Sequence, residues 1–339
     1  MAVSQQQAPA TAATVARDKR FMLFSGRANP SLAEGIAKEL NVQLGPVTLK
    51  TFTAGEVYCR FDESVRDADV FIVQSTCGNS ETGLTANDAL VELLLMIDAA
   101  VGASAARVVA VMPWFAYSRQ DKRSAVREPI SARLVAHVLE TAGADRMVTV
   151  DLHAGQVQGF FTRPLDHTTA LLMLARYFAG LRIDDLVVVS PDVGRVKLNS
   201  KFAKRVGADL ALMTKNRPAQ QVAEIGYVIG DIEGKTAVIV DDIIDSAGTL
   251  CAAAQTVLDE GAARVYAVAT HGLFSGKAYE NLSAVPFEQV VVTDTVPLRP
   301  GAPDNVVVLS VAGLLADSIT QIFTGGSLSR VFSGDNLLF

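Results

Sequence analysis

Two adjacent carboxylates, Asp241 and Asp242, follow the apolar, β-branched run 238–240. A short loop of small and hydroxylated residues, 245–249, comes next, and an Ala-rich helical pattern begins at Leu250. Backbone N–H groups and hydroxyls at such a helix N-terminus can hold a phosphate. Carboxylates suit sugar hydroxyls, or a metal ion that bridges to phosphate. The stretch predicts a site for a phosphorylated, hydroxyl-bearing compound; the structural alternative is a buried strand with a solvated acidic turn.

A second candidate group is the run 117–123, which carries Arg119, Gln120 and Asp121 after a strand expected to end at Met112. Its tyrosine could pack on a base, and its guanidinium groups could bind phosphate. These residue types suit a nucleotide, although a solvated charged loop explains the run alone equally well.

Two further segments place a polar side chain just after a strand. His153 lies in the segment 151–161, where a histidine beside glycine can approach a triphosphate or a metal ion. Asp192 precedes a glycine in the segment 189–195, which by itself resembles an ordinary turn. Ligands of open parallel sheets bind at the carboxyl ends of the strands. We therefore expect these residues, together with His271, to lie near such an edge, while a structural histidine remains the alternative for His153.

Lys215 and Arg217 follow another expected strand and precede the polar stretch 219–224. A mobile loop with two cations can close over a reacting phosphate and neutralise the charge that develops there. Composition alone favours a solvated loop at this point.

The elements that must position these residues alternate between short apolar runs and helical patterns. Strands are expected at 21–24, 47–52, 70–75, 108–112, 147–150, 186–189, 210–213, 237–240, 265–269, 290–293 and 306–309. Helices are expected at 32–40, 89–100, 131–141, 168–178, 198–206 and 250–260. Many of the strands are continuous apolar runs, which is typical of parallel strands covered on both faces.

A chain of 339 residues is long enough for two domains with their own cores. We predict an α/β protein with two similar domains, each a mainly parallel sheet flanked by helices. The predicted boundaries are a disordered tail at 1–20, an N-terminal domain at 21–163, a C-terminal domain at 164–315, and a helix and tail at 316–339 that pack back on the N-terminal domain.

Composition narrows the function class. Half of the residues are hydrophobic and the net charge is −6, so no basic face for nucleic acid is expected. Cys59, Cys77 and Cys251 are too far apart in sequence to suggest a disulfide framework or a zinc site, which favours a reducing cytosol. Residues 1–18 contain no apolar core of a secretory signal. The apolar segment 90–101 is interrupted by acids, so no membrane span is expected.

Taken together, these segments resemble the ribose-phosphate pyrophosphokinases (PRPP synthetases), which have the type I phosphoribosyltransferase fold. The resemblance runs over about 21–332, with the motifs in the family's order. It implies transfer of the β,γ-diphosphoryl group of MgATP to the 1-hydroxyl of ribose 5-phosphate. The products would be AMP and 5-phospho-α-D-ribose 1-diphosphate (PRPP), which feeds nucleotide, histidine and tryptophan biosynthesis.

The resemblance also implies residue roles. Ribose 5-phosphate would be held by the double acid and its loop: Asp241, Asp242, Asp245, Ser246, Ala247, Gly248 and Thr249. ATP would be held by Phe52, Glu56, Arg119, Gln120, Asp121 and His153, with Phe52 and Glu56 supplied by a neighbouring subunit. His153 and Asp192 would arrange Mg²⁺, while Lys215 and Arg217 would stabilise the transition state.

The family's partners are implied in the same way: a homo-oligomer, commonly a hexamer, activated by inorganic phosphate and inhibited by ADP. The chain departs from the family pattern at Ala54, where Asp or Asn is usual, at Ser246 in place of Thr, and at 78–83, a short insertion. Two alternatives are a phosphoribosyltransferase that consumes PRPP and a non-catalytic regulatory homologue. The first needs only one domain, and the second tends to lose loop cations such as Lys215.

Overall fold

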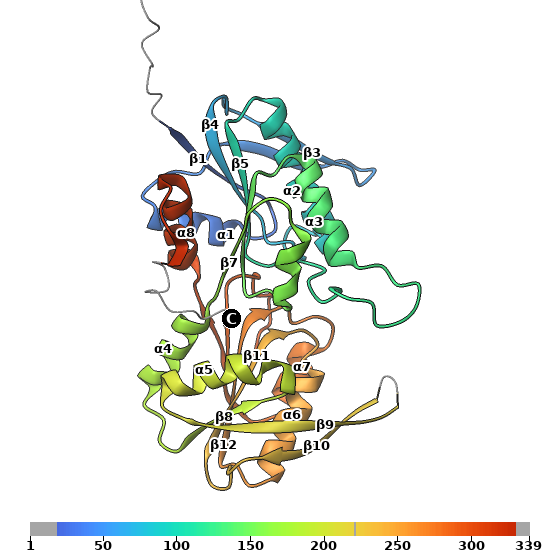
Figure 1. Cartoon of the computed structure of the whole chain (residues 1–339), viewed down its shortest axis with the longest axis vertical. Helices are drawn as coiled ribbons and strands as arrows, with labels where there is room; N and C mark the ends of the chain where they lie inside the picture. The colour runs from blue at the N-terminus through green and yellow to red at the C-terminus, as the bar shows by residue number, and fades with distance from the viewer. Residues whose placement is uncertain (1–18, 220–221, 330–339) are drawn as a thin grey trace, which may run out of the picture.

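The computed structural model describes residues 19–219 and 222–329. Figure 1 shows two α/β units along the long axis of the molecule. In the first, five parallel strands run in the order β1-β4-β5-β6-β7. These strands are β1 Arg20–Ser25, β4 Ala68–Val73, β5 Arg107–Met112, β6 Arg146–Val150 and β7 Leu165–Thr168. A separate antiparallel hairpin contains β2 Val47–Thr51 and β3 Val57–Phe61. The helices of this unit are α1 Pro30–Glu39, α2 Ala86–Gly102, α3 Ser131–Ala142 and the 3₁₀ helix η1 Gly155–Phe160.

The second unit contains a seven-stranded sheet in the order β10-β9-β8-β11-β12-β13-β14, in which only β10 is antiparallel to its neighbour. Its strands are β8 Leu186–Ser190, β9 Asp209–Ala219, β10 Val222–Ile229, β11 Thr236–Ile244, β12 Arg264–Gly272, β13 Phe287–Thr293 and β14 Val306–Leu309. Its helices are α4 Leu171–Leu181, η2 Val193–Arg195, α5 Val196–Val206, α6 Gly248–Asp259 and α7 Ala278–Ser283. The last helix of the described chain is α8 Ala312–Thr324.

The strand order reverses between β8 and β11. The chain goes from β8 to β9 on one side, whereas β11 continues to β12 on the other, although β8 and β11 pair directly. The connections therefore diverge and leave a crevice beyond the carboxyl ends of these two strands, which is where open parallel sheets bind ligands. Asp192 follows β8, and Asp241 and Asp242 lie near the end of β11.

A shared hydrophobic core joins the two units. One continuous cluster contains strand residues of the first sheet, such as Val109 and Val148, and of the second, such as Val188 and Val238. The helices α1, α4, α5 and α8 all contribute to it. Continuous β-branched runs permit this arrangement because both faces of each central strand are apolar. The two sheets are thus fixed relative to one another by packing.

Helix α8 extends the C-terminal part of the chain onto the first unit. It packs beside α1 (Figure 1), and the ring of Phe323 lies 5.2 Å from that of Phe21 on β1. Arg107 on β5 donates a hydrogen bond of 3.3 Å from Nη2 to the carbonyl oxygen of Ile322. These contacts hold α8 against the first unit.

The predicted fold class is confirmed, and each of the predicted strands overlaps a strand of the structure. The sequence patterns missed β3, β7 and β10. Because β7 pairs with β6, the first sheet continues to Thr168, past the predicted seam at 163/164. The predicted tail at 1–20 lies mostly outside the described residues, and Arg20 already begins β1. Residues 330–339 of the predicted C-terminal segment also lie outside them.

Across the described residues, no helix is both long and apolar enough to cross a bilayer.

We predict that Leu315→Ala lowers the free energy of unfolding by about 3 kcal/mol, because Leu315 is fully buried in the shared core. Denaturant titration measures the loss. The control is Asp317→Ala on the exposed side of the same helix, which should change stability by less than about 0.5 kcal/mol. Equal effects of the two substitutions would contradict the shared core.

Candidate active site

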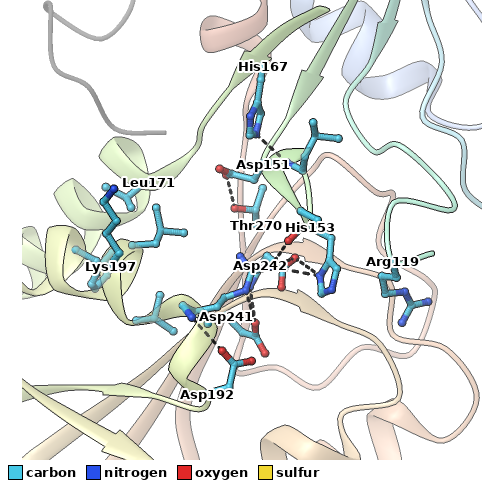
Figure 2. Close-up of a pocket in the computed structure, with 18 of the residues that line it drawn as sticks. Arg119, Asp151, His153, His167, Leu171, Asp192, Lys197, Asp241, Asp242 and Thr270 are labelled. Carbon is cyan, nitrogen blue, oxygen red and sulfur yellow. Dashed lines mark hydrogen bonds and ion pairs between the residues drawn. The ribbon is translucent and has the colours of Figure 1, made fainter. Parts of the chain in front are cut away.

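A cleft of about 930 Å³ lies where the two units meet (Figure 2). The segments that line it come from the ends of β6, β8 and β11, from the loop after β5, and from α4 and α5. The structure thus brings predicted residues from both units into one cleft: Arg119, Asp121, His153, Asp192, Asp241 and Asp242.

Asp241 and Asp242 form the acidic centre of the cleft. The sequence placed them after the strand, but β11 continues to Ile244 and Asp241 still pairs in register with Ala269 of β12. The strand persists because β12 offers a hydrogen-bonding partner along this length. Asp241 Oδ1 accepts a hydrogen bond of 2.8 Å from the backbone N–H of Asp242, so the two acids are held side by side.

The two carboxyl groups have opposite pKa shifts. Burial, reinforced by the charge of Asp242, raises the pKa of Asp241. Burial also opposes ionisation of Asp242, but a hydrogen bond from His153 and the charge of Arg195 outweigh it and lower the pKa of Asp242. Asp242 is therefore ionised and paired, whereas Asp241 has too little positive charge around it to offset its burial. Such a pair fits a cation or a set of ligand hydroxyls.

His153 reaches the acidic pair from the other unit (Figure 2). Its Nδ1 lies 2.8 Å from Asp242 Oδ2. With the proton on Nδ1 the ring donates to Asp242, which leaves Nε2 for another partner. The sequence left a structural role open for this residue; the structure places it on the surface of the cleft.

Arg195 is the residue that the sequence analysis missed. It ends η2, and its Nη2 contacts Asp242 Oδ2 and lies 3.0 Å from the carbonyl oxygen of His153. Its Nε lies 3.5 Å from Asp241 Oδ1. The signal available in the sequence was an arginine three residues after the strand-end Asp192, within a segment already selected.

The phosphate-type loop has the predicted strand–loop–helix form. Ala247 has a positive φ of 61°, and α6 begins at the next residue. Ser246, Gly248 and Thr249 are exposed there, so hydroxyls and free N–H groups at the start of a helix face solvent. The side chain of Asn281 donates a hydrogen bond of 2.9 Å to the carbonyl oxygen of Ser246, which fixes the loop.

Arg119 connects the predicted nucleotide segment to this loop. Its Nη1 lies 2.6 Å from Asp245 Oδ2, and Asp245 Oδ1 accepts from the hydroxyl of Ser275. Burial opposes ionisation of Asp245, but these two contacts outweigh it and lower its pKa. Asp121 accepts a hydrogen bond from the Gln156 amide at the cleft wall.

Three predicted ATP-site residues have surroundings of their own outside the cleft lining. Gln120 accepts a 2.6 Å hydrogen bond from the hydroxyl of Ser131. Phe52 and Glu56 lie at the β2–β3 turn, where Phe52 is 46% exposed. The ring of Phe52 lies 5.9 Å from that of Tyr58, with Lys50 Nζ 5.0 Å from its centroid. Within one chain this aromatic group faces outward from the β2–β3 turn.

Lys215 and Arg217 lie on β9, which was predicted as a loop at this point. Ile225 of β10 pairs with Lys215 and supplies the partner strand that the polar sequence did not reveal. Figure 1 shows the β9–β10 hairpin extending away from the body of the sheet. Residues 220 and 221, between its strands, lie outside the described residues.

His271, the other strand-end histidine, joins the two sheets from inside. It is fully buried, and its Nε2 lies 3.1 and 3.0 Å from the carbonyl oxygens of Val150 and Asp151. Burial lowers the pKa of His271, which keeps the ring neutral. Beside it, the hydroxyl of Thr270 donates a hydrogen bond of 2.6 Å to Asp151 Oδ2 (Figure 2). This contact holds the segment that carries His153.

Metal-binding capacity in the cleft depends on the acids and His153. Asp192 Oδ1 accepts a 3.0 Å hydrogen bond from the backbone N–H of Arg195 and thereby caps η2. Among residues 19–219 and 222–329, no three His, Cys, Asp or Glu side chains converge as a ready metal site. Mg²⁺ ordinarily takes one or two carboxylates together with substrate phosphates and water. The donor set fits such a shared site.

Comparison with known proteins covers most of the chain. Residues 21–143 match the family described as the N-terminal domain of ribose phosphate pyrophosphokinase. Residues 208–333 match the phosphoribosyl synthetase-associated domain. The ribose-phosphate pyrophosphokinase of Caldanaerobacter subterraneus is 47% identical over 92% of this chain and 97% of its own. That of Corynebacterium efficiens is 46% identical over 94% and 97%, respectively.

The fold agrees with these sequence matches. The crystal structure of phosphoribosylpyrophosphate synthetase from Mycobacterium smegmatis superposes with a TM-score of 0.84 at 44% sequence identity. The alignment covers 91% of this chain and all of that one.

We predict that Asp241→Asn stabilises the ligand-free protein by about 1 kcal/mol, or roughly 2 °C in Tm, at neutral pH and above. Burial, and after it the charge of Asp242, raises the pKa of Asp241 above its ordinary 3.8. The folded wild type therefore holds the Asp241 proton more tightly than the unfolded chain does, and its free energy of unfolding falls as pH rises from 3.8 through the raised value. The variant has no proton to lose. Thermal unfolding across this pH range measures the difference.

The control for this prediction is Asp317→Asn, which removes one exposed carboxyl on α8. A stability difference between wild type and Asp241→Asn that shrinks as pH rises would contradict the raised pKa.

Proposed function

The chain belongs to the ribose-phosphate pyrophosphokinase family, and we propose that it transfers the β,γ-diphosphoryl group of MgATP to the 1-hydroxyl of ribose 5-phosphate. The β-phosphorus–oxygen bond to AMP breaks, a new bond forms to the 1-hydroxyl oxygen, and that hydroxyl loses its proton. The products are AMP and PRPP. We also propose the cytosol as its compartment.

The observation that supports this proposal best is the division of the cleft. Within the cleft, the acidic pair comes from the second unit, whereas Arg119, Asp121 and His153 come from the first. The phosphate-type loop follows the acidic pair on the second unit, outside the cleft lining. A diphosphokinase needs acceptor and donor to meet in this way, because phosphoryl transfer depends on positioning and charge neutralisation. A phosphoribosyltransferase that consumes PRPP would need only the second set.

The acceptor is assigned to the second unit. The exposed loop residues Ser246, Gly248 and Thr249 would hold the 5-phosphate at the start of α6, with Asp245 and Ala247 shaping the loop. Asp241 and Asp242 would take the ribose 2- and 3-hydroxyls, directly or through Mg²⁺.

The donor is assigned to the first unit. Arg119, Gln120, Asp121 and His153 would hold ATP, and the ring of Phe52 with Glu56 would come from a neighbouring subunit of a homo-oligomer. His153 and Asp192 would hold Mg²⁺, which neutralises phosphate charge when bound. We extend the family's hexamer, phosphate activation and ADP inhibition to this chain as part of the same proposal.

Lys215 and Arg217 are assigned to the transition state, where cations neutralise the charge that develops on the transferred group. Their place on β9 requires the hairpin to approach the cleft during turnover. For the protein as a whole, the comparisons favour an enzyme over a regulatory homologue.

The decisive experiment is an assay of AMP release from ATP and ribose 5-phosphate with Mg²⁺, with and without inorganic phosphate and ADP. AMP formation that depends on ribose 5-phosphate supports the proposal. Ribose-independent AMP release, or pyrophosphate-dependent consumption of PRPP without AMP formation, would overturn it.

We predict that Lys215→Ala lowers kcat roughly 100-fold or more, because one cation at the transferred group is lost. The affinity for ribose 5-phosphate, measured by calorimetry, should stay unchanged. The control is Lys38→Ala, which removes an exposed lysine from α1. A Lys215→Ala enzyme with normal kcat would exclude the assignment.

We predict that Phe52→Ala raises KM for ATP roughly three- to tenfold, because a ring that stacks on adenine is lost. If this ring serves a neighbour, mixing Phe52→Ala with Lys215→Ala subunits should create sites that combine an intact Phe52 with an intact Lys215. At ATP concentrations well below KM, the mixture should then exceed the mean activity of its two components. Strict additivity at all mixing ratios would place Phe52 at its own subunit's site or outside the site.

A further inference from the structure

Arg195 occupies a central position in the cleft. Its side chain is only 14% exposed, and its guanidinium contacts Asp242 directly and approaches Asp241 at 3.5 Å. The same group donates a 3.0 Å hydrogen bond to the carbonyl oxygen of His153 in the other unit. One side chain therefore bridges the acceptor half and the donor half of the cleft.

The backbone of Arg195 covers a third acid. Its N–H donates to Asp192 Oδ1 at 3.0 Å, in the cap of η2. Arg195 thus engages oxygen atoms of Asp192, Asp241 and Asp242 at once. These are the three carboxylates that the proposed function assigns to Mg²⁺ and to the ribose hydroxyls.

A bound ligand needs some of the same oxygen atoms. Asp242 Oδ2 already contacts both His153 Nδ1 and Arg195 Nη2, and the side chain of Asp242 is only 3% exposed. Taking such a charge from water requires a close counter-charge, and two adjacent carboxylates increase that need. A divalent cation would supply positive charge in the same place as the singly charged guanidinium, so the two would exclude each other.

We propose that Arg195 is the internal counter-cation of this carboxylate set in the ligand-free protein, and that a divalent cation must displace it to bind. It acts as a positioning residue, because it holds the acids in place until the ligand replaces it. This inference rests on the proposed function for the identity of the cation-binding acids. The cation competition itself can be measured without turnover.

The test measures direct binding of Mn²⁺ to the full-length, ligand-free protein. Electron paramagnetic resonance reports the concentration of free Mn²⁺ during the titration. Arg195→Gln removes the guanidinium charge and should lower the Kd for Mn²⁺ about tenfold. Arg195→Lys keeps one charge but has no planar fork to bridge two acids, so an intermediate Kd is expected.

The matched control is Lys197→Gln. Lys197 lines the same cleft two residues further on, so its removal changes the net charge of the cleft equally. Its loss should change the Kd for Mn²⁺ less than about twofold, because Lys197 would act on the cation only through a screened charge–charge interaction and not by occupying its place.

A purely structural arginine would give the opposite sign. If Arg195 merely supported the fold of the cleft, Arg195→Gln would disorder the acids and bind Mn²⁺ more weakly. Weaker or unchanged Mn²⁺ binding by Arg195→Gln, or equal tightening in Lys197→Gln, would overturn the proposal. Should Arg195→Gln fail to fold, Arg195→Lys decides by the direction of its shift alone.

A thermal-unfolding arm separates stability from competition. Without Mn²⁺, Arg195→Gln should melt below wild type, and saturating Mn²⁺ should raise its Tm more than it raises that of wild type. If the wild-type protein formed no AMP from ATP and ribose 5-phosphate, the proposed function would be refuted. The Mn²⁺-binding results would still be interpretable.

Discussion

The constraint on which this site depends is the placement of two carboxylates next to one another at the end of a buried strand. Asp241 and Asp242 are fixed by the pairing of β11 with β12, so they cannot separate to relieve their repulsion. The protein meets this constraint with Arg195 from the segment after β8 and His153 from the other unit. The geometry of both segments follows from the need to bring positive charge and hydrogen bonds to this one place.

The topology explains how these segments can meet. The reversal of strand order between β8 and β11 opens the crevice of the second sheet, and η2 lies directly after β8. The shared core then fixes the first sheet so that its β6 end faces the crevice. Behind the cleft, buried His271 and the Thr270–Asp151 hydrogen bond join the same two edges. The cleft is therefore a consequence of rigid packing on both of its sides.

Much of this could be predicted from the sequence, because continuous apolar runs and strand-end polar residues mark a parallel α/β fold. The acidic pair, the loop 245–249 and His153 were identified from their local order alone or from family resemblance. Arg195 was missed because its importance comes from contacts with residues distant in the sequence. Asp241 and Asp242 are 46 and 47 positions away, and His153 is 42 positions away. The strand at Lys215 was missed because its partner β10 has no apolar alternation that marks it. Both errors concern contacts between separate segments of the chain, which the pattern within one segment does not record.

Residues assigned to the two substrates are paired with one another. Arg119 of the donor set holds Asp245 of the acceptor loop at 2.6 Å, and His153 holds Asp242 at 2.8 Å. A ligand that binds either half must therefore exchange an existing charged contact for a new one, so the net affinity is smaller than its own contacts suggest. The residue released from each pair lies in the other unit, within reach of the same cleft. Under the proposed assignment, each substrate would therefore break a contact that joins the two units.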